Sequence, residues 1–304
     1  MKYKVTLNNL INNKGLILCL GFFDGLHLGH QKLIEKTIEI AKLNNLNAGL
    51  LTFSNIPINK ENKRFTKKVL SSNKEKENII KNYDLNQIIF IDFDDECRLT
   101  SKENFVRFLK DEFNCKGVVV GEDYRFGSNG EGNVNYLLSL RKEDFIVEVI
   151  PQIKMDNEII SSTRIISLLN EGNISQVNKL LGRNYSLTGI VEKGFSVGKT
   201  LDFPTANISF DDNIILPLNG VYAVNVIYNN IIYKGVANIG IRPSINTMDL
   251  PLLEVHIFSF NDDLYQKELK VEFKEFIRKE TKFASVELLK EQIIKDKKKA
   301  LELL

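Results

Sequence analysis

The sequence is short of cysteine, of long apolar runs and of net charge, and each shortage excludes a class of protein. Its 304 residues include only three cysteines, Cys19, Cys97 and Cys115, and these show no paired spacing. We therefore expect neither a disulfide framework nor a cysteine-ligated zinc site, and we expect a reducing compartment. The formal net charge of +2 is too small for a surface that binds nucleic acid, so no nucleic-acid partner is expected.

No stretch of the sequence reaches the length of a membrane span. An apolar run near the N-terminus, GLILCLGFF, is short and ends at Asp24. It also has bulky Leu18 just before Cys19, where a lipoprotein segment would need a small residue. With 43% hydrophobic and 26% charged residues, the chain has the composition of a globular protein of two ordinary domains. We expect a cytoplasmic protein without a membrane partner, and a homo-oligomer stays open.

What the sequence does contain, in residues 1–184, is an alternation of strand-like and helix-like segments. Continuous apolar runs predict buried strands at residues 16–20, 48–53, 87–93, 117–121 and 146–150. Apolar residues at helical spacing predict helices between them, among others at residues 75–83 and 102–113. This α/β alternation predicts a parallel sheet with helices on both sides and with ligand sites at the carboxyl ends of its strands.

The pattern changes in residues 185–304, where short alternating strands predict an all-β barrel. We place the domain boundary between residues 184 and 185. The last twenty residues, 285–304, predict an amphipathic helix. Its inward-facing residues would be Leu288, Leu289, Ile293 and Leu301.

The stretch GFSVGKTLDFPTANI, residues 194–208, looks at first like the phosphate-binding loop of an ATPase. Such a loop needs four residues between its glycines and a helix straight after its Lys-Thr pair. Here three residues separate Gly194 from Gly198, and Pro204 would fall inside the helix, where proline costs roughly 3 kcal/mol. Two interpretations remain: a glycine-rich hairpin, or a flap whose backbone amides and Lys199 reach phosphate oxygens.

Two polar residues at the end of this stretch could complete a phosphate site. Thr205 and Asn207 lie two residues apart on a predicted strand, so their side chains point to one face. Their oxygen atoms suit Mg²⁺, which takes few protein ligands besides phosphates. Glu254, on a later predicted strand, would by default be an outward-facing residue that shares its face with His256.

The stretches GKTLDFPTANI, GVYAV, ANIGIRPS, LEVHIFSFNDDLY and FIRKETKF, in this order, resemble the riboflavin kinase domain. The resemblance implies a six-stranded barrel in which Thr205 and Asn207 sit at the Mg²⁺–ATP phosphates. It implies that Glu254 takes the proton from the ribityl 5′-hydroxyl of riboflavin. The signature residue Pro204 would lie at the same site, and Arg242 would brace it, contact the ligand or form a structural salt bridge.

In the first domain, the motif GFFDGLHLGHQKLI follows the first predicted strand and opens a helix. His27 and His30 stand three residues apart on the first turn, and Gly29 between them lets a ligand approach closely. Two imidazoles at a helix N-terminus suit the phosphates of ATP as charge builds up on the leaving group. A structural pair or a partial metal site are the other interpretations, although a third metal ligand is missing nearby.

Two later motifs also suit ligands. Ser162, Thr163 and Arg164, in ISSTRIISLL, open a late helix in an anion-binding arrangement, or simply cap it. The loop GEDYRFGSNGEGN, residues 121–133, follows a predicted strand at its carboxyl end, where a substrate would bind.

The His-x-Gly-His motif is similar to that of the nucleotidyltransferase superfamily. Together with the kinase stretches, the chain resembles the bacterial bifunctional riboflavin kinase/FAD synthetase family over essentially its whole length. This implies a Rossmann-like parallel sheet of the nucleotidyltransferase type, and two reactions: riboflavin plus ATP gives FMN, and FMN plus ATP gives FAD and pyrophosphate. The resemblance places Asp123 and Phe126 by the flavin, and Ser162 and Thr163 near the phosphates. It also implies these nucleotide-binding residues in the first motif: Gly21, Phe23, Asp24, Gly25 and Gly29.

The first domain departs from the family pattern at two places. Ile166 stands where the superfamily has arginine, and Arg164 lies roughly 200° away around a helix. The stretch TFSNIPIN lacks the histidine that the family carries there. The sequence therefore leaves open a riboflavin kinase with a weakened or vestigial adenylyltransferase domain. A third alternative, from another class, is a flavin-binding regulatory protein without turnover.

Overall fold

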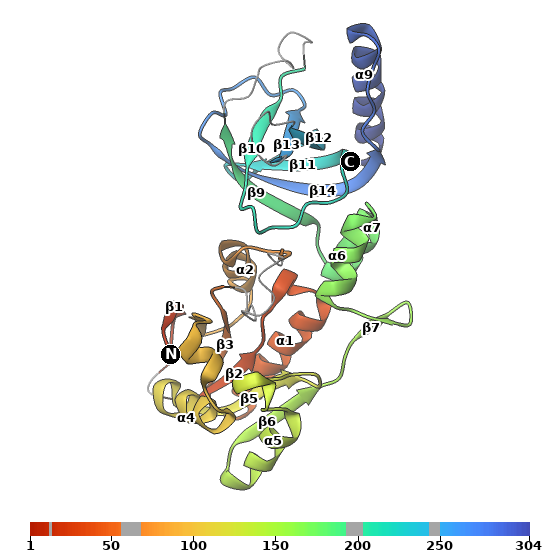
Figure 1. Cartoon of the computed structure of the whole chain (residues 1–304). Coiled ribbons are helices and arrows are strands. Elements are labelled where there is room, and N and C mark those ends of the chain that lie inside the picture. The colour runs from red at the N-terminus through yellow and green to blue at the C-terminus, as the bar shows by residue number, and fades with distance from the viewer. Residues whose placement is uncertain (12–13, 56–67, 193–202, 243–249) are drawn as a thin grey trace. The chain divides into compact units, whose positions relative to one another are not determined.

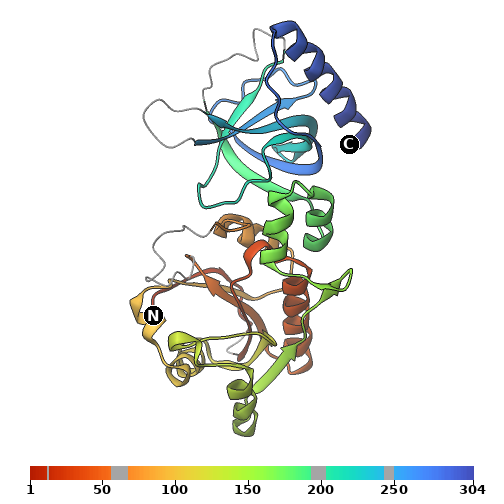
Figure 2. The ribbon, with the colours of Figure 1, turned by 45° about the vertical axis from the view of Figure 1, so that its right-hand side comes forward.

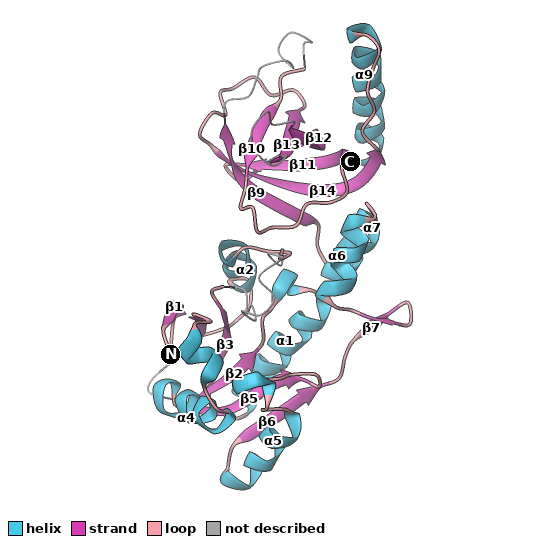
Figure 3. Ribbon diagram, in the orientation of Figure 1, coloured by secondary structure: helices cyan, strands magenta, loops and turns pink. Residues whose placement is uncertain are grey.

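The computed structural model describes residues 1–11, 14–55, 68–192, 203–242 and 250–304, and its backbone forms two compact units. These units are Met1–Ser161 and Ser162–Leu304 (Figure 1). Helices and strands alternate in the first unit, and strands predominate in the second (Figure 3). An α/β sheet and an all-β barrel are therefore joined in one chain, as the sequence predicts.

The first unit contains a six-stranded sheet with the order β1-β4-β3-β2-β5-β6. The neighbouring strands run parallel, except that β1 is antiparallel to β4. Its strands are β1 (Tyr3–Asn8), β2 (Leu16–Leu20), β3 (Asn47–Phe53), β4 (Gln87–Ile91), β5 (Cys115–Gly121) and β6 (Ile146–Ile150). The helices between them are α1 (Leu28–Leu43), α2 (Asn73–Ile80), α3 (Asp95–Leu99), α4 (Lys102–Phe113) and α5 (Val134–Ser139). A small hairpin follows, formed by β7 (Lys154–Met155) and β8 (Glu158–Ile159).

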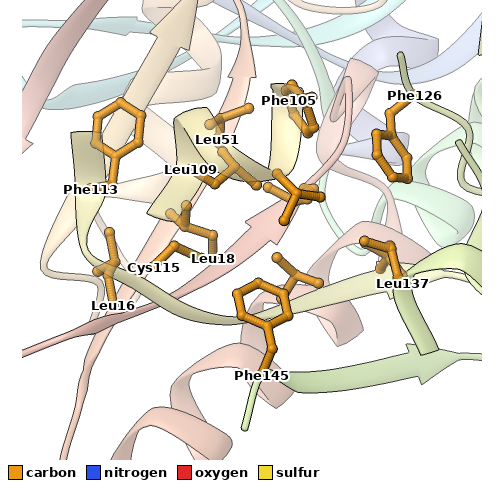
Figure 4. Close-up of a cluster of buried hydrophobic side chains, with 14 of the residues drawn as sticks. Leu16, Leu18, Leu51, Phe105, Leu109, Phe113, Cys115, Phe126, Leu137 and Phe145 are labelled. Atoms are coloured by element: carbon orange, nitrogen blue, oxygen red, sulfur yellow. The ribbon is translucent and has the colours of Figure 1, made fainter. Parts of the chain in front are cut away.

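The sheet is covered on both faces, which explains the continuous apolar runs of its strands. In β2, Leu16 and Leu18 pack into a cluster that includes Leu109 of α4 (Figure 4). The alternate residue, Ile17, packs into a second cluster that includes Ile34 of α1. Because successive side chains of a strand point to opposite faces, every residue of β2 is buried.

The strand order creates a place for ligands at the carboxyl end of β2. This strand pairs with β3 on one side and with β5 on the other. The chain therefore changes direction across the sheet between these neighbours, which is the switch point at which ligands bind in such sheets. Two loops begin there. The loop after β2 carries the motif GFFDGLHLGHQKLI, and the loop after β5 carries GEDYRFGSNGEGN, residues 121–133.

The second unit is a closed antiparallel barrel with the strand order β10-β13-β12-β11-β14-β9. Its strands are β9 (Tyr185–Glu192), β10 (Ala206–Ser209), β11 (Gly220–Tyr228), β12 (Ile231–Arg242), β13 (Leu250–Ile257) and β14 (Glu268–Arg278). The buried side chains of these strands include Tyr222, Val224, Ala237, Ile239, Leu253, Val255, Val271 and Phe273. The six-stranded barrel is the one that the resemblance implies.

Two helices precede the barrel in the chain and pack with it. They are α6 (Ser162–Asn170) and α7 (Ile174–Leu181). The backbone N–H of Leu218 donates to the carbonyl of Leu169 at 2.9 Å, and Asn178 Nδ2 donates to the carbonyl of Phe273 at 3.0 Å. The units as they pack therefore divide at residues 161/162, whereas we placed the boundary of the two functions at 184/185.

The C-terminal helix α9 (Val286–Leu303) lies alongside β11, β12 and β14 in both views of the ribbon (Figures 1 and 2). Its orientation corrects our expectation, because Leu288 and Leu301 are 49% and 46% exposed. The buried residues of the helix are Asp296 and Ala300, and Asp296 accepts hydrogen bonds from Arg278 of β14, at 3.0 Å from Nε and 2.7 Å from Nη2. This ion pair turns the helix so that only part of its apolar stripe faces the barrel.

Candidate active sites

The loop between β2 and α1 has an unusual backbone. It passes through a short 3₁₀ helix, Asp24–Leu26, before α1 begins. The φ angle is positive at Phe23 (52°), Gly25 (71°) and Leu26 (43°). Positive φ is uncommon for residues other than glycine, so the contacts around this turn must hold it in place.

His27 and His30 lie together at the start of α1. His27 is the N-cap residue, and its Nδ1 accepts a hydrogen bond from the backbone N–H of His30 at 3.4 Å. The two imidazole rings are stacked, with centroids 3.7 Å apart and planes inclined by 15°. A helix N-terminus attracts anions, so the pair stands where a phosphate group would be favoured.

The other residues of this motif differ in where they point. Phe23 is fully buried and Asp24 is 5% exposed, and Asp24 Oδ1 accepts a hydrogen bond from the backbone N–H of Leu70 at 2.8 Å. Gly21 and Gly29 are half-buried. The motif therefore includes side chains that are directed into the protein and that hold the loop from within.

The loop after β5 borders a cavity of about 360 Å³. Asp123 lines this cavity, and its Oδ2 accepts a hydrogen bond from Gln152 Nε2 at 3.4 Å. Phe126 instead belongs to the core cluster drawn in Figure 4, where it is 7% exposed. Its ring stacks on that of Tyr124, with centroids 5.6 Å apart. The loop thus has two acidic groups at the cavity, Glu122 and Asp123, whereas the ring of Phe126 is packed in the core.

The residues Ser162, Thr163 and Arg164 form the first turn of α6 and are counted with the second compact unit. Within the first unit, the carbonyl oxygen of Ile160 lies 3.9 Å from the position that a Cβ on Gly29 would take. Ile160, two positions before Ser162, therefore lies next to the His-x-Gly-His motif, residues 27–30.

In the barrel, a row of polar residues crosses four neighbouring strands. Asn207 of β10 is directly opposite Glu254 of β13, and Glu254 is directly opposite Asn238 of β12. On its other side, Asn207 is opposite Glu192 of β9. Directly opposite residues of antiparallel strands share a face and have Cβ atoms about 5 Å apart. Sequence reasoning did not single out Asn238, because strand order is needed to place it beside Glu254.

The oxygen atoms near this row suit a hard cation. Asn207 Oδ1 is buried and, among the described residues, has no hydrogen-bond partner. Thr205 is exposed just before β10 and lines a cavity of about 930 Å³ together with Glu192, Pro204 and residues of β13 and the loop after it. An acceptor that is buried without a donor is costly unless a ligand completes it. These oxygens therefore fit a divalent cation that takes its remaining ligands from phosphates and water.

His256 lies on the same face of β13 as Glu254, two residues further on. Its Nδ1 is 2.9 Å from the carbonyl oxygen of Pro204, and its ring meets that of Phe203 edge to face at 5.5 Å. A carbonyl can only accept, so Nδ1 carries a proton. Burial lowers the pKa of His256, the hydrogen bond to Pro204 raises it, and the charge of Lys297 lowers it. The neutral imidazole thus links β13 to the segment that carries Thr205.

Some expected residues cannot be placed. Gly194, Gly198 and Lys199 lie outside the described residues, as does Pro57. Arg242 ends β12, but its side chain is likewise outside the described part of the chain. Within the residues that are described, no group of three or more His, Cys, Asp or Glu side chains could hold a metal ion.

The fold and the two candidate sites define a two-domain transferase, with a nucleotidyltransferase-type sheet followed by a kinase-type barrel. Two family models match in the same order: FAD synthetase over residues 10–164 and riboflavin kinase over residues 181–304. The chain belongs to the bifunctional riboflavin kinase/FMN adenylyltransferase family. Riboflavin kinase and FMN adenylyltransferase activity are therefore its functions, and the comparisons give no support to a vestigial adenylyltransferase.

Full-length relatives agree with the family models. The chain is 39% identical over 289 residues to the bifunctional riboflavin kinase/FMN adenylyltransferase of Buchnera aphidicola subsp. Schizaphis graminum, covering 93% of this chain and 92% of the relative. It is 32% identical over 288 residues to the enzyme of the same name from Bacillus subtilis, covering 94% and 91%. Both halves of the chain thus match proteins in which the two halves are also fused.

A solved structure matches the whole fold under a different name. It is a macrolide-efflux protein from Streptococcus pneumoniae, with a TM-score of 0.87, 29% identity and 95% coverage of each chain. In the part of this chain that the structure describes, no helix has the length and apolar character needed to cross a membrane.

Proposed function

We propose that the barrel phosphorylates riboflavin to FMN and that the sheet unit adenylylates FMN to FAD, with ATP as the donor in both reactions. The observation that carries this division is the direct cross-strand pairing of Asn207 with Glu254. It puts Asn207 Oδ1, which has no hydrogen-bond partner among the described residues, and the carboxylate of Glu254 on one face of the barrel. Phosphoryl transfer needs both kinds of group. Asn207 and Thr205 hold the phosphate side of the site, and Glu254 serves the acceptor hydroxyl.

In the kinase reaction, Glu254 accepts the proton of the ribityl 5′-hydroxyl while that oxygen attacks the γ-phosphorus of ATP. Phosphoryl transfer depends mainly on in-line positioning and on neutralising charge, so one well-placed carboxylate is enough as the base. The cavity of about 930 Å³ beside Thr205 and Pro204 has room for the nucleotide. Gly194, Gly198 and Lys199 would contact the phosphates, and Arg242 would brace the site or contact the ligand.

Thr205 Oγ1 and Asn207 Oδ1 would hold Mg²⁺. When bound, the ion supplies charge neutralisation at the ATP phosphates. The two protein oxygens then fix where the phosphates lie relative to Glu254. No cluster of acidic ligands is needed, because Mg²⁺ in such sites keeps waters and phosphate oxygens as its other ligands.

In the adenylyltransferase reaction, the FMN phosphate attacks the α-phosphorus of ATP, and pyrophosphate leaves without a covalent enzyme intermediate. His27 and His30 stabilise the growing negative charge on the phosphates, assisted by the N-terminus of α1. Gly21, Gly25 and Gly29 would let the nucleotide come close to the backbone, with Phe23 and Asp24 in the same loop. Ser162, Thr163 and Arg164 would bind phosphate, and Asp123 and Phe126 would lie by the flavin.

The conditions of action follow from the substrates. Riboflavin, FMN and ATP are small, so neither nucleic acid nor a membrane is needed as a partner. ATP is abundant in the cytoplasm, where the three unpaired cysteines would also stay reduced. We place the enzyme there.

One assay tests the division of labour. The purified chain is incubated with riboflavin, ATP and Mg²⁺, and the flavins are separated by chromatography. Glu254→Gln should abolish FMN formation and leave added FMN convertible to FAD, whereas His30→Ala should do the reverse. Glu291→Gln, an exposed carboxylate on α9, is the matched control and should change neither reaction. Loss of both activities in Glu254→Gln would contradict the proposal, and wild-type product that stops at FMN would support the weakened adenylyltransferase.

A further inference from the structure

Lys76, on α2, is a buried amino group that neither reaction uses. The residue is 2% exposed. Its Nζ donates a hydrogen bond to the backbone carbonyl of Phe22 at 3.0 Å and lies 4.2 Å from the centroid of the Phe22 ring. A buried ammonium group is costly, and lysine is almost never fully buried without partners. A lysine in such a place therefore calls for an explanation beyond packing.

The surroundings of Lys76 belong to the loop that carries the histidines. Asp24 is 5% exposed, and its negative charge acts on Lys76. Burial lowers the pKa of Lys76 to about 8, and Asp24 opposes this shift. The carbonyl of Phe22 also accepts a hydrogen bond from Thr52 Oγ1 of β3 at 2.9 Å. The carbonyl at the start of the loop is thus held by two side chains from different elements.

Further contacts tie the same loop to the segment that leads into α2. The backbone N–H of Leu70 donates to Asp24 Oδ1 at 2.8 Å, and the backbone N–H of Gly25 donates to Ser71 Oγ at 3.0 Å. The residues with positive φ, Phe23, Gly25 and Leu26, lie at these attachments or directly next to them in the chain. Strained backbone persists only where its surroundings over-determine it, and such strain gathers at functional sites.

The strained loop ends at the first histidine. His27 follows Leu26 directly, caps α1 and stacks on His30. A change in the path of residues 22–26 would therefore move both imidazoles relative to a bound nucleotide. Displacing reacting groups by about 1 Å can cost roughly 100-fold in rate.

We propose that Lys76 is a positioning residue for adenylyl transfer, which fixes the loop of residues 22–26 so that His27 and His30 face the ATP phosphates. Lys76 itself touches no substrate. The inference rests on the proposed function of that loop. It also gives Asp24 a different role from the nucleotide contact that the family resemblance implies, namely as the partner of Lys76 and Leu70.

A structural role and a positioning role predict opposite results for an apolar replacement. Methionine is close to lysine in length, so Lys76→Met keeps the packing. Removing one member of a buried pair of charges destabilises a fold, because the charge of Asp24 stays behind, so some loss of stability is expected in either case. If Lys76 serves only the fold through its packing, Lys76→Met keeps activity. If it positions the loop, the molecules that remain folded in Lys76→Met lose catalysis.

The experiment uses the full chain with Lys76→Met and Lys76→Arg, and with Lys74→Met as the control, an exposed lysine of the same helix. We expect Lys76→Met to lower kcat for FAD formation by roughly 100-fold, with KM for FMN changed less than about twofold. Riboflavin phosphorylation in the same preparation should stay as in the wild type, and both rates are measured well below the midpoint of thermal unfolding of the variant. Lys76→Arg, which keeps charge and donors, should recover part of kcat, and Lys74→Met should match the wild type.

A second measurement separates the inference from the proposed function on which it rests. The chain has three histidines, so their imidazole NMR signals are few enough to follow one by one. Shifted signals of His27 and His30 in Lys76→Met together with lost FAD formation support the inference. Shifted signals with full FAD formation show that the loop is not catalytic, which overturns the function assigned to it. Unshifted signals, or loss of the fold of the first unit, overturn the positioning role of Lys76.

Discussion

The two units position the groups that we propose to handle phosphate in different ways. In the barrel, Asn207 and Glu254 meet because they are direct neighbours in the register of β10 and β13. In the sheet unit, His27 and His30 meet at the end of a strained loop that distant residues hold. A register is repeated along the whole strand, whereas a loop depends on a few contacts. The barrel site should therefore tolerate small changes nearby better than the loop site does.

The largest effect is expected where the loop has no space for a methyl group. At Gly25, φ is +71° and a Cβ would lie 2.7 Å from Leu70 Cδ1. Gly25→Ala should lower the rate of FAD formation roughly 100-fold and destabilise the first unit by about 1–3 kcal/mol. The rate is measured with FMN and ATP, and stability by denaturant unfolding.

Gly130→Ala is the matched control for this prediction. Gly130 has φ +67° but its nearest neighbour to a new Cβ, Arg125 Cβ, is 3.6 Å away. It should show the conformational cost without the loss of rate. Equal losses of rate in both variants would contradict our view that the site after β2 depends on the few contacts of its loop.

A smaller effect is expected at His256, which supports the barrel site from one side. The amide nitrogen of asparagine can take the place of imidazole Nδ1, whereas that of glutamine takes the place of Nε2. His256→Asn should therefore keep the hydrogen bond to the Pro204 carbonyl and most of the riboflavin kinase activity. His256→Gln should lose about tenfold in kcat, in line with one misplaced contact near the site. If the two variants are equally active, this hydrogen bond does not position Thr205.

The smallest expected effect is a pH dependence of the barrel's free energy of unfolding. Because the pKa of His256 lies below 6.5 in the folded chain, the unfolded chain binds a proton first as the pH falls. The free energy of unfolding of the barrel should therefore decrease as the pH falls through 6.5, until the folded form is protonated as well. Hydrogen exchange of the barrel amides between pH 5 and 7 measures this slope. His256→Asn should remove it, and a slope that persists in this variant would assign it to another group.

Much of the fold follows from pattern alone. Helix α4 begins and ends where the apolar stripe of residues 102–113 predicts, and the buried strands of the sheet match the continuous apolar runs. Helix α9 shows why such patterns are incomplete. Of the four apolar residues predicted to face inward, Leu289 and Ile293 are half-buried and Leu288 and Leu301 are exposed, whereas Asp296 is buried and forms an ion pair with Arg278. Periodicity records where apolar residues recur, and it does not record which polar residue has a buried partner.

The residues of the candidate sites also divide into those that the sequence predicted and those that it did not. The sequence and its family resemblance named Asn207, Glu254, His27 and His30, and the structure brings each pair together. Their roles stay predictions until the variants are assayed. Neither a pattern nor a motif pointed to Lys76, because nothing in the sequence of α2 distinguishes it from an exposed lysine. Its burial arises from a loop more than fifty positions earlier, and such long-range contacts leave no local signal in one sequence.

The packing boundary at residues 161/162 bears on attempts to separate the two halves by gene truncation. A cut at 184/185 would remove α6 and α7 from the barrel and uncover apolar residues such as Ile165, Leu169 and Val177. A cut at 161/162 would keep them there, but it would take Ser162, Thr163 and Arg164 away from the sheet. Under the proposed function, in which Ser162, Thr163 and Arg164 bind phosphate for adenylyl transfer, neither cut gives each half all that it uses, and this is a physical reason for the two enzymes to stay fused.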